Sequence, residues 1–262
     1  MPYKLGRKPP VRTLRTMRLA IATAKALDPL GVPPDESNDY IKSVNPNCPM
    51  FGNDQYGDCT AADTGHMLMV RSANVGMPMT PTLQDVLNFY SDTTDPPFDP
   101  NDASTDNGAN EVDVLNYLKS TGFLGHKLDS YGSVDPVDYN HMRWCVQLFG
   151  GCRIGVNLPQ SAMDQFDANE PWDIKGDLTI VGGHDIPIVH YDPSYYYVCT
   201  WGRWKQPVTR AWMERFCDEA HPELAFDWIA KQGLAPSGFD LQDLEGKIKL
   251  AMDVPDTPMA IA

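Results

Sequence analysis

The feature that most restricts the fold of this chain is a change of pattern near its middle. The first half carries three segments with apolar residues at helical spacing, and the second half carries three extended patterns. The helical segments are 60–74, 79–92 and 111–122, and the extended ones are 152–158, 182–192 and 195–202. Helices come first and strands later, with no alternation of strand and helix. This order predicts an α+β fold, with a helical half followed by an antiparallel β half.

Capping residues refine these expectations. Thr80 is expected to cap the second helix, with Pro81 at its first position. A further helix is expected to end at Gly150, and another is expected from Thr209 onward, carrying Cys217 and His221 four residues apart. The predicted organisation is a basic, proline-rich arm over 1–45, one domain over 46–235, and a C-terminal helix and tail over 236–262.

The charge of the chain is unevenly distributed. The 262 residues have a formal net charge of −14, yet residues 1–27 contain seven basic residues and no acidic one. The acidic remainder argues against a nucleic-acid partner. No apolar run is long enough to span a membrane. The basic arm is expected to pack through Leu14, Met17, Leu19 and Ile21, onto its own domain or onto another copy or a larger assembly.

The cysteines give little support for a metal or for disulfides. The chain has six cysteines and no CxxC pair, so reduced thiols and no metal or other cofactor are expected. The loop 102–113 approaches a calcium-binding pattern, with Asp102, Ser104 and Asp106 at the right spacing. Its glycine comes one position late and its last residue is Asp113, so a rim of a cleft is the better interpretation.

The stretch GDCTAAD places Cys59 where a thiol could act as a nucleophile. Asp58 stands at the expected N-cap position, which puts Cys59 in the first turn of the helix. The partial positive charge of a helix N-terminus favours a thiolate, and a nearby imidazole would add to this effect. A buried structural thiol is the alternative. His184 is the candidate imidazole, because it follows Gly182 and Gly183 and opens an apolar strand pattern.

Together these pieces resemble papain-like cysteine peptidases, including the bacteriocin-processing branch. The resemblance runs from about Asn53 to Trp204 and rests on four stretches in the family's order. They are GDCTAAD, TDNGANEVDVLNYLKSTG, CVQLFGGCRIGVNLP, and GGHDIPIVHYD followed by YYYVCTWGRW. The resemblance implies a papain-like fold, with the nucleophile on a helix of the first half and the histidine on a strand of the second.

The resemblance also assigns the remaining site residues. It implies that Cys59 is the nucleophile, that His184 is the base, and that either Asn53, by spacing, or Gln55, by residue type, donates to the oxyanion. The family has Asn or Asp as the third catalytic residue, and this chain has Thr200 in one alignment and Cys199 in another. The expected substrate-binding positions are Asn107, Gly108, Gly183 and Trp201.

Two functions follow from this resemblance. The first is a thiol hydrolase that cleaves a peptide or amide bond through an acyl-enzyme on Cys59. The second is a papain-fold protein without turnover that serves as a structural or binding component of an assembly, which the altered third position and the basic arm favour. No convincing signal peptide is present, since Arg18 and Lys25 interrupt the apolar run near the N-terminus. A cytoplasmic or assembly-associated location is therefore expected.

Overall fold

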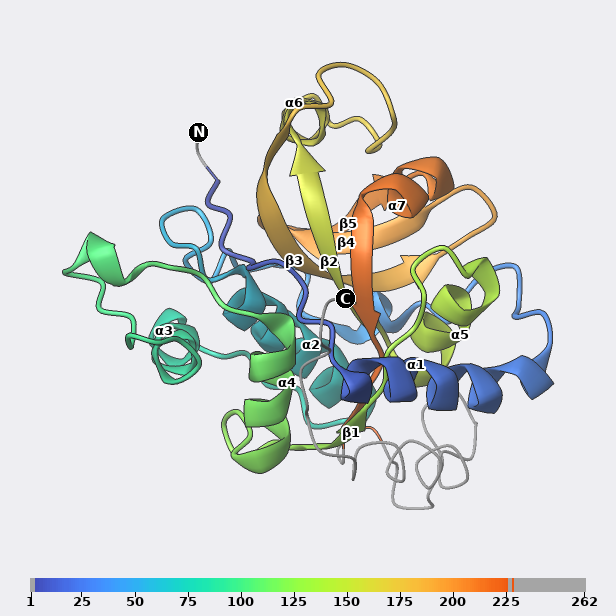
Figure 1. Ribbon diagram of the computed structural model, residues 1–262, viewed down its shortest axis with the longest axis horizontal. Helices are drawn as coiled ribbons and strands as arrows, with labels where there is room; N and C mark the ends of the chain where they lie inside the picture. Colours follow the sequence, from blue (N-terminus) through green and yellow to red (C-terminus); the bar gives the residue numbers. More distant parts are fainter. Residues whose placement is uncertain (1–2, 226–227, 229–262) are drawn as a thin grey trace.

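The computed structural model describes residues 3–225 and residue 228. It divides into a helical half and a β half, as the sequence predicts (Figure 1). Its α-helices are α1 (Leu14–Leu27), α2 (Cys59–Asn74), α3 (Leu83–Asp92), α4 (Glu111–Ser120), α5 (Tyr139–Phe149), α6 (Gln160–Asp167) and α7 (Arg210–Phe216). Its strands are β1 (Leu128–Tyr131), β2 (Cys152–Pro159), β3 (Ile180–Tyr191), β4 (Tyr196–Thr200), β5 (Arg203–Val208), β6 (Cys217–His221) and β7 (Glu223–Ala225). Short 3-10 turns lie at Asp28–Leu30, Tyr40–Ser43 and Ala103–Thr105.

The β half is built on one five-stranded antiparallel sheet in the order β5-β4-β3-β2-β6. Residues of β2 are buried at seven of eight positions, which fits a central strand covered on both faces. Helix α2 packs against β3 on one side, and α5 packs against β2 and β3. Strands β1 and β7 form a separate antiparallel pair. The fold is therefore α+β, with α2 as the element that joins the two halves.

Helix α2 is buried along almost its entire length, from Cys59 to Ser72. Such a helix gains its stability from packing rather than from an exposed polar face. It follows a tight turn in which Phe51 and Gly52 both have positive φ. Among the described residues, no helix is long and apolar enough to cross a membrane.

Several expected boundaries differ from the structure. Helix α3 is capped by Thr82, in a capping box with Asp85, and not by Thr80. Helix α7 does begin after Thr209, which accepts from the N–H of Trp212, but it ends at Phe216. Cys217 and His221 lie on β6, so the prediction that they share a helix is wrong. There β6 pairs with β2, and sheet pairing overrides the helical pattern. The expected tail helix, 240–252, lies outside the described residues.

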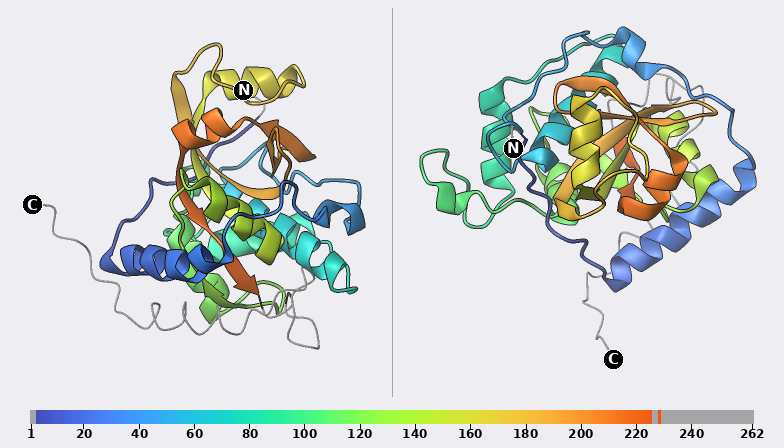
Figure 2. Two further views of the ribbon diagram at one scale, coloured as in Figure 1. Left: turned by 90° about the vertical axis from the view of Figure 1, so that its right-hand side faces the viewer. Right: turned by 90° about the horizontal axis from the view of Figure 1, so that it is seen from above.

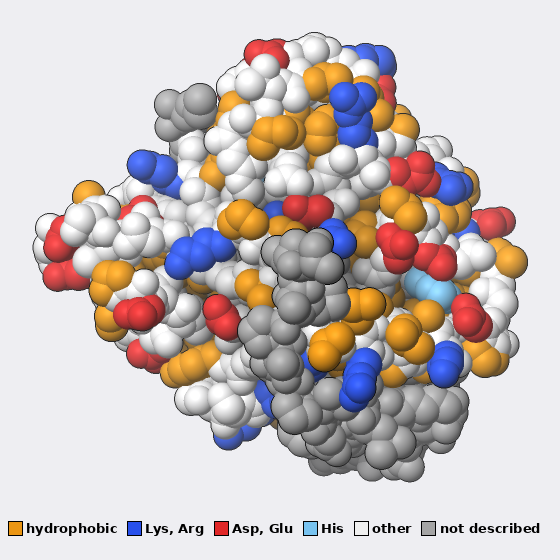
Figure 3. All heavy atoms as spheres, viewed as in Figure 1, with side chains coloured by type: hydrophobic (Ala, Val, Ile, Leu, Met, Phe, Trp, Pro, Cys, Tyr) orange, Lys and Arg blue, Asp and Glu red, His pale blue; other side chains and the backbone are white. Residues whose placement is uncertain are grey.

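The N-terminal arm is packed onto its own domain. The extended segment before α1 passes between the helical half and the sheet, as the dark blue chain in Figure 1 shows, and Figure 2 gives two further views. In α1 only Leu19 of the four expected apolar contact residues is buried. Leu14, Met17 and Ile21 are 42%, 48% and 54% exposed, so these three side chains are not buried against the protein's own domain. Whether they contact another copy stays a prediction. Figure 3 shows apolar and basic side chains next to each other along α1.

Candidate functional site

Helix α2 and the sheet bring the expected site residues to one small cavity. Asn53, Cys59, His184, Thr200 and Trp201 all line it. The cavity has a volume of about 10 Å³, which is room for no more than about one water molecule. The structure therefore gathers the proposed nucleophile, base, third residue and oxyanion donor, and leaves no space for a substrate beside them.

The other expected residues lie around this cavity. Gln55 is exposed and does not line it, so of the two carboxamides only Asn53 is at the cavity. Asn107 is exposed, and its side chain donates to the carbonyl of Ser104. Gly108 and Gly183 contact the N-terminal arm.

Strands β3 and β4 fix the imidazole of His184. Its Nε2 lies 2.9 Å from Oγ1 of Thr200, and its ring stacks on Trp201 with 4.9 Å between the ring centroids. Among the described residues Nδ1 of His184 has no hydrogen-bond partner. Thr200 thus holds the Nε2 side of the ring, and the Nδ1 side is left without a hydrogen bond.

The arm fills the cleft with its backbone. The N–H of Lys4 donates to the carbonyl of Asn53 at 3.0 Å, and the N–H of Arg7 donates to the carbonyl of Gly183 at 3.2 Å. The N–H of Ala109 donates to the carbonyl of Gly6 at 2.9 Å, and the N–H of Lys8 donates to the carbonyl of Ala109 at the same distance. Arg7 and Ala109 form a parallel bridge. The rim expected to receive a substrate backbone therefore receives residues 4–8 of the same chain.

Gly6 is the point of closest approach. A Cβ atom built on Gly6 would lie 1.6 Å from the carbonyl oxygen of Gly57, and one on Gly108 would lie 1.8 Å from the carbonyl oxygen of Gly6. No side chain fits at either position, because the two backbones are in direct contact. The arm can lie this deep only because residue 6 is glycine.

Arg7 anchors the arm in a buried acidic pocket. Its side chain is 1% exposed and forms ion pairs with Glu111, Glu219 and Asp218, the first at 3.0 Å. Burial would lower the pKa of Arg7, but these carboxylates raise it. Burial raises the pKa of Glu111 well above its usual range, and the charges of Arg7 and Arg153 oppose this rise.

Tyr3 fixes the start of the arm beside Trp201, which lines the cavity. Its ring stacks on Trp201 with centroids 4.4 Å apart, and its hydroxyl donates to Asp167 at 2.8 Å. Trp201 is therefore held between Tyr3 and His184. Both ends of the arm segment 3–8 are fixed by side chains, and its middle is fixed by backbone hydrogen bonds.

Cys59 and His184 are both neutral in this arrangement. Burial, followed by the charge of Asp185, raises the pKa of Cys59 to about 12. The backbone N–H groups of Asp185 and Gly6 act in the opposite direction and do not compensate. Burial, with the charge of Arg7, lowers the pKa of His184 to about 3. The prediction that the helix N-terminus and the imidazole favour a Cys59 thiolate is wrong for this closed state, because desolvation outweighs both.

Asp58 does not cap α2 with its side chain. Its carboxyl group is buried, and it accepts from Nδ2 of Asn53 at 3.4 Å. Burial raises the pKa of Asp58 well above its usual range. Asn53 Nδ2 also lies 3.4 Å from the carbonyl oxygen of Lys4, so the proposed oxyanion donor already faces a carbonyl of the arm.

The loop 102–113, which approaches a calcium-binding pattern in sequence, makes hydrogen bonds within the protein. Asp102 accepts from the N–H of Ser104 at 3.0 Å and begins the short 3-10 turn. Asp106 accepts from the N–H of Gly57 at 3.0 Å and from the hydroxyl of Tyr90 at 2.9 Å. Asp106 therefore supports the turn that precedes Cys59.

Sequence reasoning placed an arm on the protein surface and missed that it enters the cleft. The available signal was local: the glycine Gly6 directly precedes Arg7 in a proline-rich basic segment. The acidic partners of Arg7 are 104 to 212 residues away in sequence. A contact at such separation leaves no periodic trace in a single sequence.

Comparison with solved structures identifies the fold. The chain is similar to xylellain, a cysteine protease from Xylella fastidiosa, with a TM-score of 0.56 and 14% identity over 85% of this chain and 96% of that one. It is also similar to procathepsin B S9 from Trypanosoma congolense, with a TM-score of 0.52 and 14% identity, covering 85% and 86% of the two chains. A third similar structure is a Carica candamarcensis cysteine protease in complex with E-64, with a TM-score of 0.52 and 14% identity. The match covers 73% of this chain and 99% of that one. The sequence matches no family model, and it has no significant match among curated proteins. The protein has a papain-like fold.

Proposed function

We propose that this protein is a latent thiol hydrolase that cleaves a peptide or amide bond, with its cleft closed by residues 3–8. The observation that carries the proposal is the meeting of Cys59, His184 and Thr200 at one cavity under the backbone of the arm. The papain-like fold of cysteine proteases supports it.

The chemistry follows from the groups at the cavity. Nδ1 of His184 accepts the proton of the Cys59 thiol, and the sulfur attacks the carbonyl carbon of the substrate. Nδ2 of Asn53 donates to the oxygen that becomes negative. The C–N bond then breaks, the amine leaves with the proton held by His184, and water hydrolyses the thioester. Thr200 keeps the ring in position through Nε2.

Activity on this proposal requires the arm to move. With the arm in place the thiol is desolvated, and its pKa of about 12 leaves almost no thiolate at neutral pH. Displacement of the arm admits water and substrate to the cavity. It also removes the nearby charge of Arg7. Because that charge lowers the pKa of His184, its removal raises the pKa. Both changes favour the thiolate–imidazolium pair.

Replacement of Gly6 by Val tests this directly. The side chain cannot fit against Gly57, so the arm must leave the cleft. We expect Cys59 to react with iodoacetamide about tenfold faster or more than in the wild type at pH 7. We also expect the variant to hydrolyse a mixed peptide library, followed by mass spectrometry.

Two controls make the result specific. The Arg12→Ala variant alters an exposed arm residue outside the cleft and is expected to behave as the wild type. The Gly6→Val, Cys59→Ser double variant must lose hydrolysis. If Cys59 becomes reactive and no peptide is cleaved, the protein is not a hydrolase. If Cys59 stays unreactive, the arm does not control access to it.

A further inference from the structure

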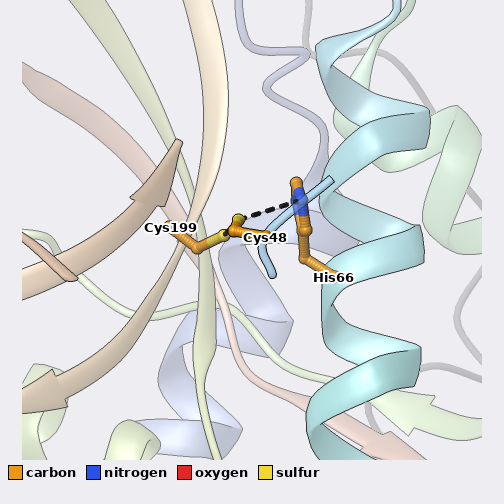
Figure 4. Close-up of side chains that lie close together, drawn as sticks. All are labelled: Cys48, His66 and Cys199. Carbon is orange, nitrogen blue, oxygen red and sulfur yellow. Dashed lines mark hydrogen bonds between the residues drawn. The ribbon is translucent and has the colours of Figure 1, made fainter. Parts of the chain in front are cut away.

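A second group of reactive side chains lies beside the candidate site and has no role in the proposed hydrolysis. It consists of Cys48 from the loop before α2, His66 from α2, and Cys199 from β4 (Figure 4). The two sulfur atoms are 3.4 Å apart, and Sγ of Cys48 is 3.7 Å from Nε2 of His66. The three ligand atoms all lie within 4.8 Å of one another. Segments 18 and 151 residues apart thus bring three metal-binding groups together.

We propose that Cys48, His66 and Cys199 bind a zinc ion. Zinc takes thiolate and imidazole ligands in tetrahedral geometry, at about 2.3 Å from sulfur and about 2.0–2.1 Å from nitrogen. These bond lengths separate two ligand sulfurs by about 3.8 Å, and a sulfur and a nitrogen by about 3.6 Å. The two observed separations, 3.4 Å between the sulfurs and 3.7 Å from Sγ of Cys48 to Nε2 of His66, are within a few tenths of an ångström of these values. Two thiolates and one imidazole are a soft set that suits zinc better than magnesium or calcium.

The histidine is oriented before any ion arrives. The ring of His66 packs against both Phe51 and Trp204, with centroid separations of 5.0 and 5.4 Å. In the structure its Nε2 donates to the carbonyl of Pro49 at 2.8 Å. Zinc would take the Nε2 lone pair in place of this hydrogen bond, so Nε2 would lose its proton and the carbonyl of Pro49 would lose its donor.

The two thiols lie close enough to share one cation, with their sulfur atoms 3.4 Å apart. Both would lose their protons when the ion binds. Cys48 is partly exposed and the other two residues are buried, which gives the ion a path from the Cys48 side.

The position of the proposed zinc site suggests that a bound ion would stabilise the contact between the two halves. His66 belongs to the helical half and Cys199 to the sheet, so a shared ion would tie the two halves together. Cys199 directly precedes Thr200, which contacts His184. The ion would have three protein ligands and an open fourth position for water.

Metal binding to the purified full-length chain tests the proposal. The chain is prepared reduced, exposed to one equivalent of zinc, desalted and measured by elemental mass spectrometry. We expect about one zinc ion per chain in the wild type and a higher Tm with zinc than without. With cobalt(II) in place of zinc, we expect near-ultraviolet charge-transfer absorption from thiolate ligands and visible bands of a tetrahedral site.

Two variants test whether Cys48 is a ligand. Cys48→Ser changes a partly exposed residue and should fold normally, which circular dichroism without zinc checks; its zinc affinity should fall about tenfold or more. Cys59→Ser is the matched control, because it removes a thiol that lines the same cavity as His66 and Cys199 but is outside the cluster. It should keep zinc, the Tm increase and the cobalt spectrum.

Three outcomes overturn the proposal. The first is a wild-type chain that retains no zinc after this exposure. The second is a Cys48→Ser variant that binds zinc as the wild type does, or a Cys59→Ser variant that loses it. The third is a Cys48–Cys199 disulfide in the protein as isolated, in place of a metal.

Discussion

At the scale of single residues, His184 is held neutral by its surroundings. Its ring stacks on Trp201, its Nε2 contacts Thr200, and the cation of Arg7 lies nearby. Burial and that cation both oppose a second proton, so the pKa of His184 falls from 6.5 to about 3. The unfolded chain therefore binds a proton at His184 between these two values, and the folded chain does not.

This difference predicts a pH dependence of stability. The contribution of His184 is fully present above about pH 6.5 and is lost as the pH falls toward 3, because protonation stabilises the unfolded state. Between pH 7 and pH 5 the wild type should lose about 2 kcal/mol of unfolding free energy beyond the loss in His184→Gln. Urea titrations of both proteins at pH 7, 6 and 5 measure it. If the unfolding free energies of the two proteins fell equally between pH 7 and pH 5, this result would contradict the buried, neutral state of His184.

At the scale of elements, Arg153 on β2 joins α2, β3 and β7. Its guanidinium is fully buried, forms an ion pair with Asp185, donates to Glu223 at 2.7 Å and to the hydroxyl of Thr64 at 2.9 Å, and lies 3.5 Å from Asp63. Burial raises the pKa of Asp63 well above its usual range, while Arg153 opposes this rise. Arg153 therefore links carboxyl groups of both halves, and Arg71 adds a second cation at Glu223.

Removal of the Arg153 cation should be costly. Arg153→Met removes the ion-pair partner of the buried Asp185 and one of the two cations beside Glu223, which keeps Arg71 at 2.9 Å. We expect a loss of about 3–5 kcal/mol in unfolding free energy. The matched control is Arg210→Ala, which breaks the exposed pair with Glu214 and should cost about 0.5 kcal/mol or less. Chemical denaturation compares them. Equal losses in the two variants would mean that the Arg153 cluster does not stabilise the contact.

At the scale of the whole molecule, the arm closes the cleft and also places Arg7 among buried carboxyl groups. Arg7 compensates Glu111 and Glu219 inside the protein, and its backbone bridges Gly183 and Ala109 across the two halves. The rest of the chain is strongly acidic, so the basic arm neutralises charge at the point where the halves meet.

Truncation of the Arg7 side chain should therefore lower global stability. Arg7→Ala leaves a buried cluster of carboxylates, which costs about 3–5 kcal/mol and corresponds to a Tm decrease of roughly 10 °C for a chain of this size. Arg12→Ala removes the same charge from an exposed position and should change Tm by about 2 °C or less. Differential scanning calorimetry gives both values. A similar Tm for the two variants would show that the buried ion pairs of Arg7 stabilise the protein no more than an exposed charge does.

The sequence by itself determined what short-range patterns encode. Helical spacing identified α2 and α4, alternation and apolar runs identified β2 and β3, and the left-handed Gly150 marked the end of α5. Each of these depends on neighbours within one or two turns of the chain. The order of the elements was then sufficient for the α+β class and for the resemblance that placed Cys59 and His184 on facing elements.

Only the tertiary structure decided the state of the site. The pKa of Cys59 depends on burial and on Asp185, a residue 126 positions later in the chain, and not on its helix alone. The closure of the cleft by Gly6, and the meeting of Cys48 with Cys199, join segments that no local pattern connects. Burial and long-range contacts set the protonation and access of these groups, because the desolvation of a thiol or a carboxylate is larger than the effect of its immediate neighbours in sequence.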